Sequence, residues 1–116
     1  MIKYNADMTK DIKVKMRGGN GQAVIKSVFD KGEYKGASRL VATITLEPGC
    51  SIGAHIHENE EEIFYIIKGT AAYNDNGKIE ILNVGDSCIC LSGQEHSIAN
   101  ESIDEPLEIF AVILTY

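Results

Sequence analysis

Residues 49–69 read GCSIGAHIHENEEEIFYIIKG and contain two of the chain's three histidines, His55 and His57. Side chains two positions apart in a β-strand point to the same side, so His55 and His57 can bind one ion together. Imidazole and carboxylate groups are ligands of first-row divalent metals. With Glu62 close behind and His96 further along the chain, the pattern predicts a metal site built from four side chains.

The composition is that of one soluble globular domain. The chain has 116 residues, of which 44% are hydrophobic and 24% are charged, and this length suffices for a single core. The net charge of −6 argues against nucleic acid and against an anionic membrane surface, because both require a basic face. No run approaches the ~20 apolar residues of a membrane span, and the N-terminus lacks the apolar segment of a secretory signal. We therefore expect a cytoplasmic protein.

The chain has three cysteines, which is an odd number and too few for a disulfide framework. Cys88 and Cys90 share one face of an expected strand, and we interpret them as reduced, small hydrophobic side chains of a packed sheet. The alternative is a redox role or a thiolate ligand, for which the chain offers no Cys-x-x-Cys spacing.

From residue 23 onward, short β-favouring runs alternate with turn residues, and Asn76-Gly77 is a strong hairpin signal. The expected strands are 23–29, 39–46, 51–57, 61–67, 70–74, 78–82, 86–91, 95–100 and 107–114. Only residues 30–35 hint at a helical turn. This spacing predicts an all-β sandwich or barrel over residues 23–116. The lysine-rich residues 1–22 are interpreted as a short N-terminal arm that ends in a glycine-rich loop.

Two of the expected strands are apolar on both faces, 63–67 and 109–114. If Glu62 points inward, then Phe64 and Ile66 follow it, and Ile63, Tyr65 and Ile67 form a second apolar stripe. A soluble protein rarely leaves such a stripe in water. We expect a homodimer, because closed two-fold dimers are the commonest oligomers.

The two histidine-bearing segments resemble the two motifs of the cupin superfamily. The first motif is Gly, five residues, His-x-His, three or four residues, Glu, six residues and Gly, and it is matched from Gly49 to Gly69. The second is Gly, five residues, Pro-x-Gly, two residues, His, three residues and Asn, and it is matched from Gly85 to Asn100. The one departure is Leu91, where the family usually has proline. The chain is most similar to small, single-domain cupins of the conserved-barrel type.

The resemblance implies a double-stranded β-helix, or jelly-roll barrel, that holds one divalent transition metal inside. Its implied ligands are His55, His57, Glu62 and His96. Manganese, iron, nickel, cobalt and zinc all suit this ligand set. The six-residue spacing to Gly69 favours Glu62 over Glu61. The acidic residues Glu58, Glu60 and Glu61 could add ligands, but we expect them in a solvated loop.

Cupins with this ligand set include dioxygenases, decarboxylases, isomerases and lyases, so the resemblance implies a metal-dependent enzyme acting on a small oxygen-bearing molecule. The chain offers no clear base besides the ligands, which favours dioxygenase-like chemistry over the other three classes. The alternative is a non-catalytic module that binds a sugar, an organic acid or the metal itself. The candidates for substrate contacts are Arg39, Thr43, Tyr73 and Gln94. Arg39 could pair with a carboxylate or phosphate, or could be a solvated charge at a sheet edge.

Overall fold

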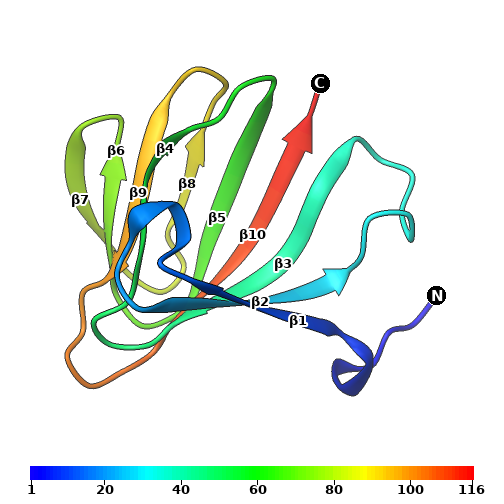
Figure 1. Cartoon of the computed structure of the whole chain (residues 1–116), viewed down its shortest axis with the longest axis horizontal. Coiled ribbons are helices and arrows are strands. Elements are labelled where there is room, and N and C mark those ends of the chain that lie inside the picture. Colours follow the sequence, from blue (N-terminus) through cyan, green and yellow to red (C-terminus); the bar gives the residue numbers. More distant parts are fainter.

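The computed structural model describes all residues, 1–116, and folds them into two antiparallel β-sheets (Figure 1). The elements in chain order are η1 (Asn5–Asp7), β1 (Thr9–Val14), η2 (Met16–Gly18), β2 (Gln22–Phe29), β3 (Ser38–Leu46), β4 (Ser51–Ile56), β5 (Glu60–Lys68), β6 (Ala71–Asp75), β7 (Lys78–Leu82), β8 (Ser87–Cys90), β9 (Glu95–Asn100) and β10 (Leu107–Thr115). The two helical elements are short 3₁₀ turns. No helix here has the length and apolarity that crossing a bilayer requires.

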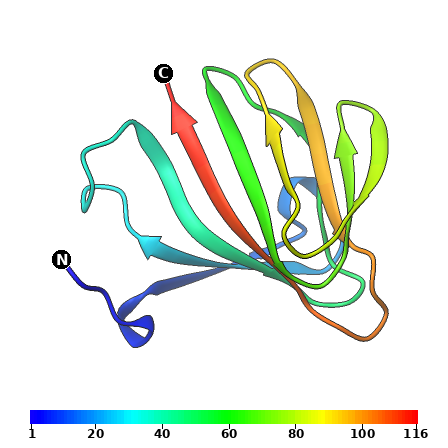
Figure 2. The same cartoon turned by 180° about the vertical axis from the view of Figure 1, so that it is seen from behind.

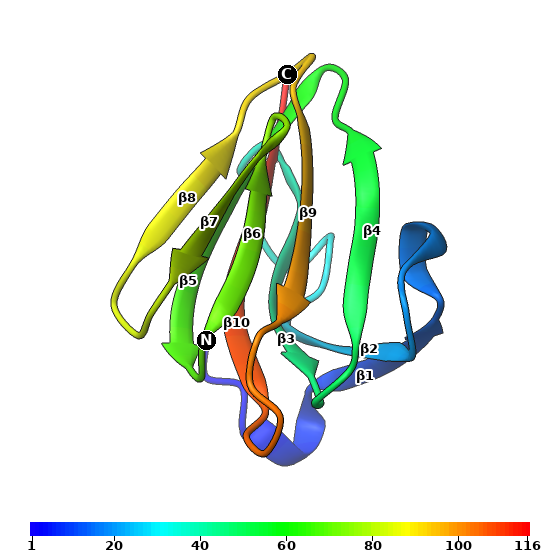
Figure 3. The ribbon, with the colours of Figure 1, turned by 90° about the vertical axis from the view of Figure 1, so that its left-hand side faces the viewer.

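The larger sheet has the strand order β1-β2-β3-β10-β5-β8, and the smaller sheet has the order β4-β9-β6-β7. From β3 onward the chain therefore passes from one sheet to the other at every connection except the β6–β7 hairpin, as in a jelly-roll barrel. Figure 2 shows the larger sheet from behind, with β10 between β3 and β5. Figure 3 shows the smaller sheet, in which β4 lies at the edge beside β9. The all-β jelly-roll prediction is thus confirmed.

Each strand expected from residue 23 onward is present, with ends that differ by at most a few residues. The hairpin between β6 and β7 turns at Asn76 and Gly77, which both have the positive φ that a two-residue hairpin turn needs. The helical turn suggested for residues 30–35 is absent, and this segment is a connection of turns and bends. Gly32 and Gly36 in this short segment disfavour a helix.

The first 22 residues, expected as an arm, contain a strand that the sequence analysis did not predict. Strand β1 pairs with β2 along its whole length, from Thr9 opposite Ser27 to Val14 opposite Gln22. All six residues of β1 are exposed, so its sequence lacks the apolar alternation that reveals a half-buried strand. The pairing carries the turn that follows β1 to the edge of the smaller sheet, where η2 contacts β4.

The core lies between the two sheets. Ile44, Leu46, Ile66, Ile98, Leu107 and Ile109 are among its fully buried side chains. Along β5, Glu62, Phe64 and Ile66 are buried, whereas Tyr65 is 47% exposed and Ile67 is 40% exposed on the other face. The alternation expected for this strand is therefore confirmed, and one apolar face of the larger sheet is left in contact with solvent.

Candidate metal centre

Four side chains from both sheets meet inside the barrel. His55 lies on β4, His57 directly follows that strand, Glu62 lies on β5, and His96 lies on β9 opposite His55. One potential ligand atom from each of the four lies within 4.8 Å of every other. His57, Glu62 and His96 are 3%, 5% and 1% exposed, whereas His55 is half-buried, so three of the four side chains are almost completely removed from water.

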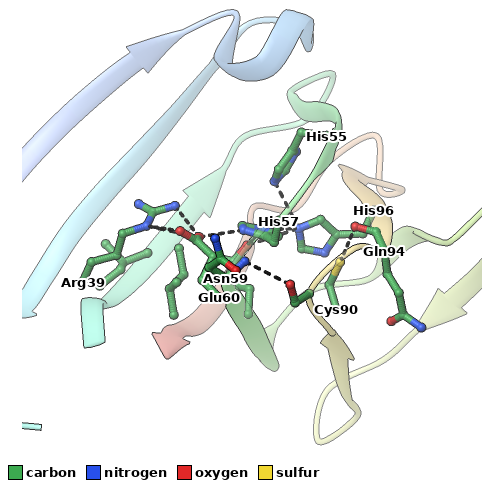
Figure 4. A network of polar contacts seen from close by, with 12 residues as sticks. Arg39, His55, His57, Asn59, Glu60, Cys90, Gln94 and His96 are labelled. Atoms are coloured by element: carbon green, nitrogen blue, oxygen red, sulfur yellow. Dashed lines mark hydrogen bonds and ion pairs between the residues drawn. The ribbon is translucent and has the colours of Figure 1, made fainter. Parts of the chain in front are cut away.

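The Nε2 atoms of the histidines point toward one another and toward the carboxylate. Nε2 of His96 lies 3.0 Å from Nε2 of His57 and 3.1 Å from Nε2 of His55. Oε1 of Glu62 lies 3.1 Å from Nε2 of His57 and 3.2 Å from Nε2 of His96. Figure 4 shows the imidazoles of His55 and His57 converging with that of His96 from β9.

Each histidine uses its other ring nitrogen, Nδ1, for a separate hydrogen bond. Nδ1 of His55 donates to the carbonyl oxygen of Gly53 at 2.7 Å, and Nδ1 of His57 donates to Oε2 of Glu60 at 2.8 Å. Nδ1 of His96 lies 2.9 Å from the hydroxyl oxygen of Tyr73. We assign the proton of each neutral ring to Nδ1, since an acceptor faces it there. This assignment leaves a lone pair on every Nε2 atom.

Three lone pairs and a carboxylate oxygen that face one another at about 3 Å repel one another unless a proton or a metal ion lies between them. Cis ligands about 2.1 Å from an octahedral ion lie about 3.0 Å apart, whereas tetrahedral ligands at that distance lie about 3.4 Å apart. Four of the six pairs of ligand atoms lie 3.0–3.2 Å apart, between these two values, and every pair lies within 4.8 Å. The four residues therefore fit a divalent transition metal, as the sequence predicted.

The pKa shifts of His57 and Glu62 also favour a positive charge between these side chains. The hydrogen bond with Glu62 raises the pKa of His57, although burial opposes the shift. Burial acts to raise the pKa of Glu62, but hydrogen bonds with His57 and His96 outweigh it and lower the pKa. Burial is the main cause that lowers the pKa of His55, and the nearby charge of Arg17 contributes. The buried carboxylate thus stays ionised and stabilises a proton or a metal ion beside it.

Glu60 is not the solvated residue that the sequence analysis expected. Its carboxylate accepts hydrogen bonds from Nε of Arg39 at 2.9 Å and Nη2 of Arg39 at 2.7 Å, in addition to that from His57. The bonds from Arg39 are the main cause that lowers the pKa of Glu60 to about 2, with a smaller effect from His57. Glu60 therefore orients one imidazole of the cluster and is itself held by an arginine (Figure 4).

A cavity of about 220 Å³ opens beside the four side chains. Apolar side chains that include Ile44, Ile52, Phe64 and Ile113 form much of its wall. Asp11, Lys13, Arg17 and Arg39 also line it, and three of these four are cationic. The cavity therefore combines an apolar wall with positive charge contributed by β1, the η2 turn and β3.

Of the four residues expected to contact a substrate, only Arg39 lines this cavity. Thr43 points to the outer face of the larger sheet, beside Lys10 and Lys26, because its neighbours Ala42 and Ile44 point inward. Tyr73 is buried beneath His96 and contacts that imidazole. The side-chain oxygen of Gln94 accepts a hydrogen bond from the backbone N–H of Leu91 and closes a turn.

The cysteines agree with the interpretation as packed hydrophobic residues. Burial raises the pKa of the Cys88 thiol to about 12 and that of the Cys90 thiol to about 11. Both side chains therefore stay protonated at neutral pH, and a thiol is a poor metal ligand compared with a thiolate. Neither belongs to the cluster of four potential ligands.

Two further residues, Arg17 and Lys13, line the cavity from the N-terminal segment and were not among the residues predicted for the site. No local pattern marks these residues, because their position depends on the pairing of β1 with β2 and on the contact of η2 with β4.

A family model described as "Cupin domain" matches residues 42–113, which is more than half of the chain.

This chain is a cupin.

Comparisons with individual proteins agree with this assignment. The cupin is 38% identical over 114 residues to a protein of Thermotoga maritima named oxalate-binding protein, a match that covers 98% of this chain and 93% of the relative. A crystal structure of a predicted oxalate decarboxylase from the same organism superposes with a TM-score of 0.93 at 37% identity and covers 100% of both chains. The polyketide cyclase RemF of Streptomyces resistomycificus shares the fold, with a TM-score of 0.78 at 16% identity over 99% of this chain and 80% of that one.

Proposed function

We propose that this cupin binds a small dicarboxylate of the oxalate class at a divalent transition metal. The observation that carries the proposal is the convergence of four ligand atoms within 4.8 Å at the wall of a 220 Å³ cavity. The relative that is 38% identical over 98% of the chain is named for oxalate binding, which supports the choice of ligand.

The metal would be held by Nε2 of the three histidines and by the carboxylate of Glu62. When bound, an octahedral ion supplies Lewis-acid positions beyond its four protein ligands, and carboxylate oxygens are suitable donors for them. The protein residues fix the imidazole rings through Gly53, Glu60 and Tyr73. The apolar wall of the cavity excludes bulk water, which strengthens the attraction between the ligand and the site.

A compact dianion suits the cavity better than a sugar does. A cavity of about 220 Å³ is below the range of typical sites for larger ligands, which starts at about 300 Å³. Lys13, Arg17 and Arg39 bring positive charge to a protein whose net charge is −6. Cationic side chains around a small cavity favour a ligand with more than one carboxylate.

Oxalate decarboxylation is the second candidate, since a solved structure that is 37% identical is described as a predicted oxalate decarboxylase. That reaction consumes a proton to form formate and carbon dioxide, so it needs a proton donor at the cavity. The two carboxylates that line the cavity are Asp11, which pairs with Lys13 at 3.1 Å, and Glu62, which belongs to the cluster. The absence of a free acid at this position favours binding over turnover. The dioxygenase-like reaction favoured by the sequence analysis has no counterpart in the names of these two relatives.

The test begins with protein that has been freed of metal by a chelator and then loaded separately with each of the five candidate metals. Isothermal titration calorimetry with oxalate should detect binding to the metal-loaded wild type, and none to the metal-free protein or to His96→Ala. Thr43→Ala is the matched control, because Thr43 lies on the outer face of the sheet and should leave binding unchanged.

Product analysis separates the two candidates. Incubation of the metal-loaded protein with oxalate should leave the oxalate intact if the protein is a binding module. Formation of formate and carbon dioxide that His96→Ala abolishes would establish the decarboxylase instead. A failure of oxalate to bind with any of the five metals would overturn the proposed function.

A further inference from the structure

Arg17 is the one cationic side chain of the cavity wall that has no partner. Lys13 pairs with Asp11 at 3.1 Å, and Arg39 binds Glu60 through two nitrogens. The guanidinium of Arg17 makes no ion pair and no side-chain hydrogen bond, although it lines the same cavity as His55 and His96. Arg17 is exposed, and its five N–H donors make no hydrogen bond to the protein, so they are available to a ligand in the cavity.

The turn that carries Arg17 adopts a backbone conformation that its residues disfavour. Lys15 has φ 50° and Arg17 has φ 55°, both in the left-handed region that residues with a Cβ atom rarely occupy. Backbone hydrogen bonds enforce this shape, with Lys15 N–H donating to the carbonyl of Gly21 at 2.8 Å and Gly18 N–H donating to that of Lys15 at 2.9 Å. Strained backbone that the surroundings maintain is often associated with a functional site.

The same turn is fixed against the strand that carries His55. Backbone N–H of Ser51 donates to the carbonyl of Asn20 at 2.9 Å, and N–H of Asn20 donates to the hydroxyl of Ser51 at 2.9 Å. A Cβ atom on Gly53 would collide with the backbone carbonyl of Arg17, so the two backbones touch. Figure 3 shows the η2 turn lying beside β4. The position of Arg17 is thus set relative to the metal centre by backbone contacts.

We propose that Arg17 is a specificity-determining residue. It binds the carboxylate oxygens of the bound dicarboxylate that point away from the metal centre. This inference rests on the proposed function. A planar guanidinium can donate two parallel hydrogen bonds to a carboxylate, which a single ammonium group cannot do. Arg17 thereby selects dicarboxylates over ligands that have one carboxylate and no second anionic end.

The experiment compares oxalate with glycolate, which retains one carboxylate but replaces the other with a hydroxymethyl end. Arg17→Asn removes the charge, and asparagine tolerates a positive φ, so the turn should keep its shape. Lys15→Asn is the matched control, because Lys15 is a cation of the same turn with φ 50° that does not line the cavity. Calorimetry on the zinc-loaded proteins measures both ligands, and a separate zinc titration checks that metal affinity is unchanged.

Arg17→Asn should weaken oxalate binding about tenfold or more, while glycolate binding changes by less than about twofold. Lys15→Asn should leave both affinities close to those of the wild type, and Arg17→Lys should recover only part of the loss. In nuclear magnetic resonance spectra, the Nε–H signal of Arg17 should shift with oxalate and not with glycolate. This signal is identified by its absence from Arg17→Lys.

Two outcomes would overturn the inference while leaving the proposed function standing. The first is an affinity of Arg17→Asn for oxalate that equals that of the wild type. The second is an equal loss of oxalate affinity in Arg17→Asn and Lys15→Asn, which would indicate only a diffuse effect of net charge. Failure of the wild type to bind oxalate in the presence of zinc and the other candidate metals would overturn both.

Discussion

Glu60 accepts a hydrogen bond from Nδ1 of His57 at 2.8 Å, and this bond holds the imidazole with its Nε2 atom facing the other three ligand atoms. Outer carboxylates of this kind commonly contribute a factor of about 10–100 to metal affinity. Glu60→Gln should therefore bind zinc or manganese about tenfold more weakly, since the amide carries no charge. A competition titration with a chromophoric chelator measures the change.

The control for this substitution is Glu58→Gln, which changes an exposed carboxylate of the same connection. It should bind metal as the wild type does. Equal affinities for the two variants would mean that Glu60 has no part in orienting His57, and that its contact with Arg39 is only structural.

The same carboxylate should make the metal-free protein sensitive to acid. Hydrogen bonds from Arg39, and to a smaller extent from His57, lower the pKa of Glu60 from 4.5 to about 2 in the folded state. A lowered pKa stabilises the fold above the unfolded value of 4.5, and this contribution disappears as the pH falls from 4.5 toward 2. The free energy of unfolding of Glu60→Gln should thus lie below that of the wild type above pH 4.5 and approach it only as the pH falls toward 2.

Urea unfolding of both metal-free proteins at several pH values measures this difference. A difference in the free energy of unfolding that stayed constant between pH 4.5 and pH 2 would contradict the prediction. It would mean that the contacts of Glu60 with Arg39 do not depend on the ionisation of Glu60. Glu58→Gln again provides the comparison, because its side chain makes no ion pair and no hydrogen bond.

Three of the four candidate metal ligands could be placed from the sequence because their geometry is local, whereas His96 was placed by its motif. His55 and His57 are two positions apart on an extended segment, and Glu62 begins the inward alternation that Phe64 and Ile66 continue. The period of two that side chains follow along a strand is enough to place them. The same rule could have excluded Thr43, because Ala42 and Ile44 beside it belong to the apolar inner face.

The other residues of the site could not be predicted, because tertiary structure alone brings them there. Glu60 belongs to a run of acidic residues that looks solvated, and its partner Arg39 is 21 positions away on another strand. Arg17 reaches the cavity only because the exposed strand β1 pairs with β2. Neither position carries a periodic or compositional signal of its own.

The outer face of the larger sheet should be the contact surface of a homodimer. Tyr65, Ile67, Ile89 and Leu114 are exposed on strands β5, β8 and β10. Adjacent apolar side chains on a flat sheet favour a sheet-to-sheet contact between two copies. Sedimentation equilibrium should give twice the chain mass of 12.7 kDa for the wild type and the chain mass for Tyr65→Lys combined with Ile67→Lys.

A lysine substitution on the smaller sheet provides the control for the predicted dimer. Ile81 on β7 is 50% exposed, so Ile81→Lys adds a similar charge at a similarly exposed position and should leave the dimer intact. A wild type that sediments as a single chain at micromolar concentration would rule out the dimer.

Gly53 should not tolerate replacement by a residue with a side chain, because it lies between the turn of Arg17 and the strand of His55. A Cβ atom at this position would collide with the carbonyl group of Arg17 and would lie 2.9 Å from the backbone nitrogen of Gly19. Backbone atoms on both sides cannot move without breaking the hydrogen bonds between Asn20 and Ser51. Gly53→Ala should therefore lower the free energy of unfolding by about 1–3 kcal/mol.

Gly36→Ala is the matched substitution, because no atom lies within 4 Å of a Cβ atom built there and its φ is not positive. It should be neutral or slightly stabilising, since alanine restricts the unfolded chain more than glycine does. Denaturant unfolding measures both variants, and calorimetry with oxalate shows whether the displaced turn also weakens ligand binding. Equal stability of the two variants would mean that η2 can move away from β4 at little cost. The backbone contact at Gly53 would then not fix the position of Arg17.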